Sequence, residues 1–355
     1  MPTDQPIFAI SDTWFDCWSD AFGDQAYGVW QTRDAAGARL HYRREARTIA
    51  GLKLAVIKSA TNLQTVRFDL RTKAETVDPR FALDLLRDTG ADMLELDFLA
   101  PDAKALASLR SNDCGLPTTI ETMARSPWVD CRGSFDEWLA TRSPRKTWRR
   151  RERQALGDMK MISRLVTDRG EVETVLDEVL AVDERTWKST VGGALKQDPA
   201  MARFYVDLAS AAADAGALAL YLLVHDGRIV AFEYNLRANG AMYLLKKGYL
   251  PEYQKISPGQ VLTLRVLRDV FADPDLQRYD MLGGTPKADP TKTTYATGED
   301  WLYRVHAFAP TAKGRLAYLV HEGERRLKQT ARPLWLWYKT NVGSRQAPRG
   351  KSPTT

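Results

Sequence analysis

The chain has 355 residues, of which 44% are hydrophobic and 27% charged, a composition typical of a folded globular protein with two domains. Its formal net charge of +6 favours anionic partners such as a CoA phosphate, a polyanionic glycan or a membrane surface. The sequence has no zinc-finger spacing and no RNP signature, so no nucleic-acid partner is expected. Cys17, Cys114 and Cys131 lack the paired spacing of a disulfide scaffold or zinc site, and no apolar run approaches the ~20 residues that span a bilayer, so we expect a cytoplasmic protein.

The first part of the chain predicts a mixture of helices and strands. Residues 7–24 predict a helix, because Trp14, Trp18 and Phe22 recur every four residues and therefore share one face. A second helix ends at Gly90, a typical C-cap residue. This second helix covers 79–89, and a third is expected over 103–111. Strands are expected over 26–32, 38–43, 52–59, 63–70, 93–98 and 128–131. No Gly-rich phosphate loop is visible in this part, which we delimit as residues 1–133.

A capping box formed by Ser134 and Glu137 marks the start of a different region. The chain breaks at Ser143-Pro144 and restarts as the densest basic run of the sequence, residues 145–153. This run fits a solvated helix face or, alternatively, a basic wall beside an anionic cofactor or substrate. A strand over 161–167 and helices over 170–187 and 199–215 follow.

Three consecutive antiparallel strands are predicted next, over 218–224, 229–237 and 242–250, because Asp226-Gly227 and Asn239-Gly240 are hairpin turn sequences. An amphipathic helix follows, with apolar residues at positions 261, 264, 267, 270 and 271. The remaining expected elements are a strand over 278–282, a loop over 283–298, a strand over 302–309, a helix over 314–328 and a disordered basic tail over 343–355.

The junction between the third of these strands and the long helix carries a motif that bears on function. A helix N-terminus presents amide groups and partial positive charge to an anion such as a phosphate. Here Pro258 suits the first helical turn, and Gly259 lets a ligand approach the backbone. Ser257-Pro258-Gly259 alone is more often a plain helix start, so its meaning depends on the order of the surrounding elements.

That order resembles the GNAT superfamily, and more closely its BioF-like, CelD-type branch, which is linked to bacterial cellulose and exopolysaccharide biosynthesis. The resemblance covers about residues 7–330. Its matches are the Trp-rich first helix with Phe22-Gly23, Ser134-Phe-Asp-Glu-Trp, Arg149 to Arg153, Glu184-Arg-Thr-Trp187-Lys188, Asp226-Gly227, Tyr249 to Gly259, and Asp280-Met-Leu-Gly-Gly284. A Tyr-Lys pair followed by an aromatic residue is matched only by Thr291-Lys292 and Tyr295, so the tyrosine of that pair is absent here.

The resemblance implies an α/β fold of the α+β type with two tandem GNAT-like halves, each a mixed, mainly antiparallel sheet flanked by helices. The N-terminal half, 1–133, would be degenerate, and 134–342 would be the acyltransferase domain. The donor would be acetyl-CoA or another acyl-CoA, with no metal. The resemblance places the CoA diphosphate over Gly259, Gln260 and Val261, with Tyr249, Leu250, Ser257 and Pro258 in the same site, and the pantetheine between residues 244–250 and 278–282.

Five side chains are candidates for catalysis, in which the acceptor attacks the thioester directly. Glu233 lies mid-strand among apolar neighbours, although it could also be a charge on a solvent face. Asp280 ends a strand near the expected thioester or, alternatively, caps the following loop. Tyr253, Lys292 and Tyr295 are candidate proton donors or substrate contacts. The four histidines are expected to form no cluster; they are His41, His225, His306 and His321.

The predicted function is therefore acyl transfer from acyl-CoA to the nitrogen or oxygen of a small-molecule or glycan acceptor, such as an amino sugar, in exopolysaccharide or cell-envelope metabolism. A peripheral association with a membrane or a polysaccharide synthase stays open. Two alternatives keep the fold: a Fem-type aminoacyltransferase that uses aminoacyl-tRNA, and a non-catalytic GNAT-like scaffold for polysaccharide machinery. The absence of a coiled-coil insertion with sustained heptads disfavours the Fem-type alternative.

Overall fold

The computed structural model describes residues 11–23, 27–31, 37–65, 67–186 and 198–341. The start of the first predicted helix (7–10), the matched Trp187-Lys188 and the predicted tail (343–355) lie outside these residues.

The helices of the described residues are α1 (Asp12–Phe22), α2 (Phe81–Thr89), α3 (Lys104–Arg110), α4 (Phe135–Ala140), α5 (Arg145–Glu152), α6 (Arg169–Glu184), α7 (Pro199–Asp214), α8 (Pro258–Ala272), α9 (Pro290–Thr293) and α10 (Ala312–Asn341). The strands are β1 (Tyr27–Gln31), β2 (Arg39–Ile49), β3 (Leu52–Ser59), β4 (Met93–Leu99), β5 (Thr118–Asp130), β6 (Ile162–Val166), β7 (Leu218–His225), β8 (Arg228–Ala238), β9 (Ala241–Tyr249), β10 (Arg278–Asp280) and β11 (Gly298–Phe308).

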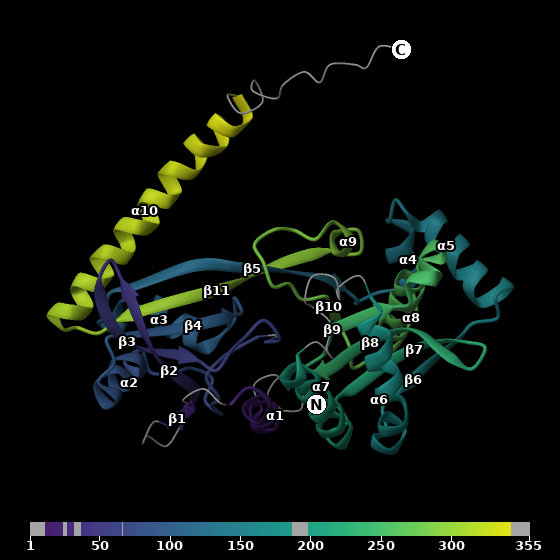
Figure 1. The fold of residues 1–355 in the computed structure, drawn as a ribbon, viewed down its shortest axis with the longest axis horizontal. Coiled ribbons are helices and arrows are strands. Elements are labelled where there is room, and N and C mark those ends of the chain that lie inside the picture. Colours follow the sequence, from purple (N-terminus) through teal and green to yellow (C-terminus); the bar gives the residue numbers. More distant parts are fainter. Residues whose placement is uncertain (1–10, 24–26, 32–36, 66, 187–197, 342–355) are drawn as a thin grey trace, which may run out of the picture.

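These strands form one mixed sheet of 11 strands in the order β1-β2-β3-β4-β11-β5-β10-β9-β8-β7-β6. The long strands β5 and β11 lie in the middle, pair antiparallel and run from one half of the molecule to the other (Figure 1). The other neighbour of β5 is β10, and the other neighbour of β11 is β4. Each sequence half therefore lends a strand to the sheet of the other half.

A parallel pair of strands occurs once in each half. β3 pairs with β4, and β9 pairs with β10, each over three residue pairs, and α2 or α8 lies between the two strands in the chain. This repeat and the helices around the sheet confirm the expected mixed α/β architecture. In the N-terminal half, the Ser59 hydroxyl accepts a hydrogen bond from the Asp97 amide at 3.0 Å, which ties β3 to β4 just beyond their pairing.

Neighbouring side chains on β9 identify the helices that cover the two faces of the C-terminal half. Lys246 forms an ion pair with Asp183 of α6 at 3.3 Å, whereas Lys247 donates to the Thr263 hydroxyl of α8 at 3.2 Å. Because side chains alternate along a strand, α6 and α8 lie on opposite faces. α7 packs on α6, and α4 and α5 pack on α8. α1 from the start of the chain packs on α7, which joins the two halves away from the sheet.

Most predicted elements are confirmed, including the three antiparallel strands β7, β8 and β9. The strand predicted over 63–70 is wrong: Phe68 makes only an isolated bridge to Leu99. Phe68 and Leu70 are buried but Leu63 is 77% exposed, so this irregular segment fills the core without joining a ladder.

Two other elements are longer than predicted, and one was not foreseen. β5 begins at Thr118, ten residues before the expected 128–131; polar Thr119 and Ser126 occupy buried positions, so apolar residues do not alternate along this part of the strand. α10 continues beyond the expected 328 to Asn341, and the short helix α9 interrupts the predicted loop over 283–298.

α10 starts against β11, and its C-terminal part projects away from the rest of the molecule (Figure 1). Ala317 of this helix packs with Leu54, Val56, Met93 and Phe308 in a second, smaller core. None of the helices among the described residues has the length and apolarity needed to cross a membrane.

Candidate functional site

The opening between β9 and β10 is the feature from which the site is built. The two strands pair only from Arg278↔Ala241 to Asp280↔Tyr243, although β9 continues to Tyr249. On the other side of β9, the partners of β8 skip Leu245, which is therefore an extra residue. Such a β-bulge bends a strand and increases its twist. The bulge at Leu245 thus lies just beyond the last residue of β9 that pairs with β10. From there on, no described strand pairs with this edge of β9.

The chain leaves β9 through a 3₁₀ segment, Pro251–Ile256, and enters α8 at Ser257. Ser257 has a φ of 52°, a left-handed conformation that is uncommon for any residue except glycine. No side chain of the described residues caps this end of α8, and the amides of Gln260 and Val261 turn back to the Ser257 carbonyl at 2.9 and 3.3 Å. The helix start keeps the partial positive charge that attracts an anion.

The seven residues predicted to hold the cofactor all lie around this helix start. A Cβ added to Gly259 would lie 3.5 Å from Cδ1 of Tyr249, an ordinary contact, so the protein itself does not require glycine here. Leu250 and Val261 are buried, and the Leu250 amide donates to the Val230 carbonyl at 2.9 Å. Pro258 is buried, whereas Tyr249, Ser257 and Gln260 are half-buried.

The basic run over residues 145–153 also reaches this helix start. Part of the run is a solvated helix face, as the first interpretation predicts, and part of it lies beside the expected anion site, as the second predicts. Arg151 of α5 donates to the Gln260 side chain in the first turn of α8. Arg149, Arg150 and Arg153 are exposed, and the helix changes to a π-helical turn over Arg153–Asp158. The run is thus a solvated face on one side and brings one guanidinium to the start of α8 on the other.

Glu233 lies in a buried polar cluster beneath α8. Its side chain is 0% exposed, which excludes a position on a solvent face. One carboxylate oxygen accepts from the Tyr279 hydroxyl at 2.6 Å and the other from the Thr263 hydroxyl at 2.7 Å. Lys247 lies opposite Glu233 in the β8–β9 register and also contacts the Thr263 hydroxyl. Glu233 therefore links β8, β10 and α8 where β9 and β10 separate.

Tyr295 joins this cluster from the segment after α9. Its ring stacks on Trp148 of α5 with centroids 4.6 Å apart, and the Lys247 ammonium lies 5.9 Å from its centroid. Its hydroxyl is buried and has no hydrogen-bond partner among the described residues. Burial, together with the charge of Glu233, raises the pKa of Tyr295, so the phenol stays protonated at neutral pH.

Lys292 holds the end of β10. Its ammonium donates to the Met281 and Leu282 carbonyls at 2.8 and 2.7 Å. Leu282 has a φ of 52°, a left-handed conformation that is costly for a leucine. Burial lowers the pKa of Lys292, and the nearby charge of Lys247 acts in the same direction while Asp289 opposes it. Lys292 and Lys247 thus converge on the opening from opposite sides.

Both carboxylate oxygens of Asp280 accept hydrogen bonds from other groups of the protein. Oδ1 accepts from the Ser126 hydroxyl at 2.6 Å and from the Leu282 amide at 3.0 Å, so Asp280 does cap the following loop. Oδ2 forms ion pairs with Arg67 at 2.7 Å and Arg278 at 2.8 Å. Burial by itself would raise the pKa of Asp280, but the two guanidinium groups hold it below its usual range.

Tyr253 stands apart from the other four catalytic candidates. Its hydroxyl lies 3.1 Å from Nδ1 of His225, at the end of β7. The structure thus brings Glu233 and Tyr295 together, places Asp280 and Lys292 at the end of β10, and leaves Tyr253 beside the β7–β8 hairpin.

Four residues of the site carry no sequence motif: Lys247, Thr263, Tyr279 and Trp148. Lys247 could have been found from its cross-strand position opposite Glu233 once the Asn239-Gly240 hairpin fixed the register. Thr263 and Tyr279 lie in elements whose mutual placement depends on the crossover from β9 to β10. No local signal distinguishes Trp148 from a helix residue that packs on the core.

A small cavity of about 120 Å³ lies next to the end of β10. It is lined by Leu282, Gly284, Asp289 and Lys292, with Arg125 of β5 and Glu299 of β11. Its lining carries both positive and negative charges, which suits a small polar group.

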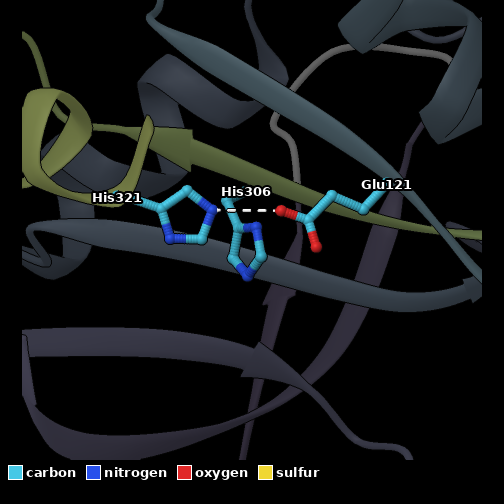
Figure 2. A group of neighbouring side chains, drawn as sticks. All are labelled: Glu121, His306 and His321. Atoms are coloured by element: carbon cyan, nitrogen blue, oxygen red, sulfur yellow. Dashed lines mark hydrogen bonds and ion pairs between the residues drawn. The ribbon is translucent and has the colours of Figure 1, made fainter. Parts of the chain in front are cut away.

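The prediction that the histidines form no cluster is wrong. His306 of β11 and His321 of α10 lie with ring centroids 4.5 Å apart, and Glu121 of β5 lies beside them (Figure 2). The tertiary fold brings them together because β5 and β11 pair and α10 returns over them. This cluster lies in the N-terminal half of the sheet, outside the site at β9 and β10.

The crossover from β9 through α8 to β10, the bulge and the uncapped helix start together characterise the C-terminal α/β part of the chain. Residues 142–291 match the family model of the acetyltransferase (GNAT) domain. Over these residues, which make up less than half of the chain, the sequence is similar to that family. No curated protein sequence matches the chain significantly.

Solved structures show the same fold over most of the chain. FemX superposes with a TM-score of 0.53 and 12% identity, covering 81% of this chain and 90% of FemX. L-PGS from Bacillus licheniformis gives 0.51 and 11%, covering 86% of this chain and 95% of that chain. A conserved protein of unknown function from Bacteroides thetaiotaomicron gives 0.54 and 10%, covering 84% and 90%. At such identities the likeness concerns the fold alone.

Proposed function

We propose that this protein transfers an acyl group from acyl-CoA, such as acetyl-CoA, to an amine or hydroxyl of a polar acceptor. One observation carries the proposal: β9 and β10 separate after Asp280↔Tyr243, and the diverging β9 leads directly to the uncapped start of α8. In this proposal the edge of β9 that β10 leaves unpaired forms one wall of a slot for the donor, with the anion-binding start of α8 at its mouth.

In this proposal the diphosphate of CoA binds at Gly259, Gln260 and Val261. Gly259 has no side chain to cover the backbone. The side chain of Gln260 accepts a hydrogen bond from Arg151. The pantetheine extends along the edge of β9 toward the bulge at Leu245. The thioester then lies where Lys292 and Asp280 fix the end of β10.

The acceptor nucleophile attacks the thioester carbonyl, the C–S bond breaks, and the thiolate of CoA leaves and takes a proton from a protein group, which regains one from the acylated amine or hydroxyl. Tyr295 is our candidate donor of that proton, because its hydroxyl is protonated and makes no hydrogen bond within the described residues. Glu233 positions this region through Tyr279 and Thr263. Lys292 and Asp280 act as positioning residues for the backbone of Met281 and Leu282.

The acceptor enters beside the cavity at the end of β10, whose charged lining includes Arg125, Asp289 and Glu299. Such a lining favours a polar acceptor, and we propose an amino sugar, a glycan or a small amine of exopolysaccharide or cell-envelope metabolism. The proposal covers transfer of an acetyl or another acyl group, to either a nitrogen or an oxygen of the acceptor.

A second candidate function uses the same slot with a different donor, an aminoacyl group carried on tRNA. Arg149, Arg150 and Arg153 are exposed and belong to the same basic run as Arg151, which contacts the start of α8, and this run favours it because a polyanionic donor would gain from these charges. The likeness of the fold to FemX is consistent with this candidate.

The decisive experiment measures binding of acetyl-CoA by calorimetry to the wild type and to Gly259→Glu. A carboxylate at a helix N-terminus favours the helix but repels a diphosphate. We therefore expect unchanged or higher thermal stability with at least about tenfold weaker binding, equivalent to about 1.4 kcal/mol. Gly323→Glu in α10 is the matched control, because an added Cβ there meets nothing within 4 Å.

Equal binding by the two glutamate variants would contradict the diphosphate site. If acetyl-CoA does not bind the wild type but an aminoacyl group is transferred from aminoacyl-tRNA, the second candidate replaces the first. If neither donor reacts with any amine or hydroxyl acceptor, the chain is a non-catalytic scaffold.

A further inference from the structure

A row of polar side chains crosses the N-terminal half of the sheet beneath α10. His306 of β11 lies between Glu95 of β4 and Thr119 of β5 in the strand register. Its Nε2 is 3.1 Å from the Glu95 carboxylate and its Nδ1 is 3.3 Å from the Thr119 hydroxyl. His306 is 4% exposed, so both ring nitrogens face groups of the protein rather than solvent.

The carboxylate of Glu95 fixes the proton of His306. Glu95 forms ion pairs with Arg47 and, at 2.7 Å, with Lys58, so it meets His306 as a carboxylate. A carboxylate only accepts hydrogen bonds, so His306 donates to it from Nε2. The lone pair of Nδ1 then faces the Thr119 hydroxyl of β5, and a metal ion bound to Nδ1 would replace that contact; Thr119 and Glu121 share one face of β5.

His321 and Glu121 complete the group above this lone pair. Nε2 of His321 is 3.3 Å from a carboxylate oxygen of Glu121, and Figure 2 shows both side chains converging on the ring of His306. One ligand atom from each of Glu121, His306 and His321 lies within 4.8 Å of the other two. Two ligands of one zinc ion, each at about 2.1 Å, lie at most about 4.2 Å apart, so only small side-chain rotations are needed.

We propose that Glu121, His306 and His321 bind one divalent transition-metal ion, with zinc as the best match. Two imidazole nitrogens and one carboxylate, with water in the fourth position, form a common zinc ligand set. Glu95 supplies the partner that orients such a histidine, because metal-bound histidines usually donate their second N–H to a carboxylate. The proposed acyl transfer does not use these residues.

The ion would join three elements that are distant in the chain. Glu121 belongs to β5, His306 to β11 and His321 to α10, the helix whose C-terminal part projects away from the rest of the molecule (Figure 1). Beyond His321 the helix presents exposed Leu327 and continues away from the sheet. Metal binding would therefore hold α10 against β5 and β11 at His321.

The test titrates zinc into chelator-treated full-length protein by calorimetry. We expect one zinc ion per chain in the wild type and at least tenfold weaker binding in His321→Gln and in Glu121→Gln. Both replaced side chains are only partly buried, so these variants keep the fold. His225→Gln is the matched control, because it removes a histidine outside the cluster and is expected to bind zinc as the wild type does.

Two further readouts distinguish a specific site from adventitious binding. Cobalt in place of zinc should give the intense visible bands of a four-coordinate ion in the wild type and lose them in His321→Gln. Zinc should also slow amide exchange in the turns of α10 around His321. Equal zinc affinity of His321→Gln and wild type, or weakening by His225→Gln alone, would overturn the proposal.

Discussion

At the scale of single residues, the site is defined by where polar groups are buried and what they contact. Asp280 and Glu233 are both 0% exposed, yet each carboxylate oxygen has a donor within the protein. A buried charge requires such partners, because its desolvation would otherwise be too costly. Tyr295 differs from them, because its buried hydroxyl has no partner among the described residues.

This difference leads to a prediction for Tyr295→Phe. Removing an unsatisfied buried hydroxyl should leave the unfolding free energy unchanged or raise it by about 1 kcal/mol. Loss of the proton donor should lower kcat by roughly 10²- to 10⁴-fold with little change in acyl-CoA affinity. Chemical denaturation and steady-state kinetics measure the two effects. Wild-type kcat in this variant would assign Tyr295 a packing role only.

At the scale of elements, the loop after β10 shows how a sequence motif serves packing. A Cβ added to Gly283 would lie 1.7 Å from the Arg125 carbonyl of β5, whereas one added to Gly284 meets nothing within 4 Å. The Gly283-Gly284 pair matched to the family thus contains one glycine that the fold requires sterically and one that it does not.

The two glycines form a matched pair for mutation. Gly283→Ala should push the loop away from β5, lowering the unfolding free energy by about 2 kcal/mol or more and weakening activity through Leu282 and Lys292. Gly284→Ala should change stability by no more than about 0.5 kcal/mol. Thermal denaturation gives the comparison. Similar losses in both variants would show that the close approach to Arg125 does not govern this loop.

At the scale of the whole molecule, the exchange of β5 and β11 makes the two sequence halves interdependent. β5 follows the N-terminal elements in the chain but contributes a strand beside β10, and β11 follows the C-terminal elements but pairs with β4. Arg67 adds a buried ion pair across the same seam, to Asp280.

We therefore expect the full chain to unfold in one cooperative transition, with equal calorimetric and van't Hoff enthalpies. A fragment beginning at residue 134, where the second domain is proposed to start, lacks β5 and leaves β10 and β11 without their shared neighbour. It should not give a cooperative transition by calorimetry. Two separate transitions in the full chain would show instead that the halves are energetically independent.

The sequence by itself determined the elements whose signals are local. The two hairpins at Asp226-Gly227 and Asn239-Gly240, the helix after Pro258 and the capping box at Ser134 follow from turn chemistry and periodicity within a few residues. The seven residues expected around the cofactor converge for the same reason, since they are almost contiguous in the chain.

Only the tertiary structure decided which distant residues meet. The partners of Glu233, the stacking of Trp148 on Tyr295, and the grouping of His306 with His321 and Glu121 all depend on strand order. Strand order is set by packing and hydrogen bonding between segments that can be more than 200 residues apart, and no local pattern encodes it. The first part of β5 gave no strand signal for the same reason, because polar Thr119 and Ser126 are buried there by neighbours elsewhere in the chain.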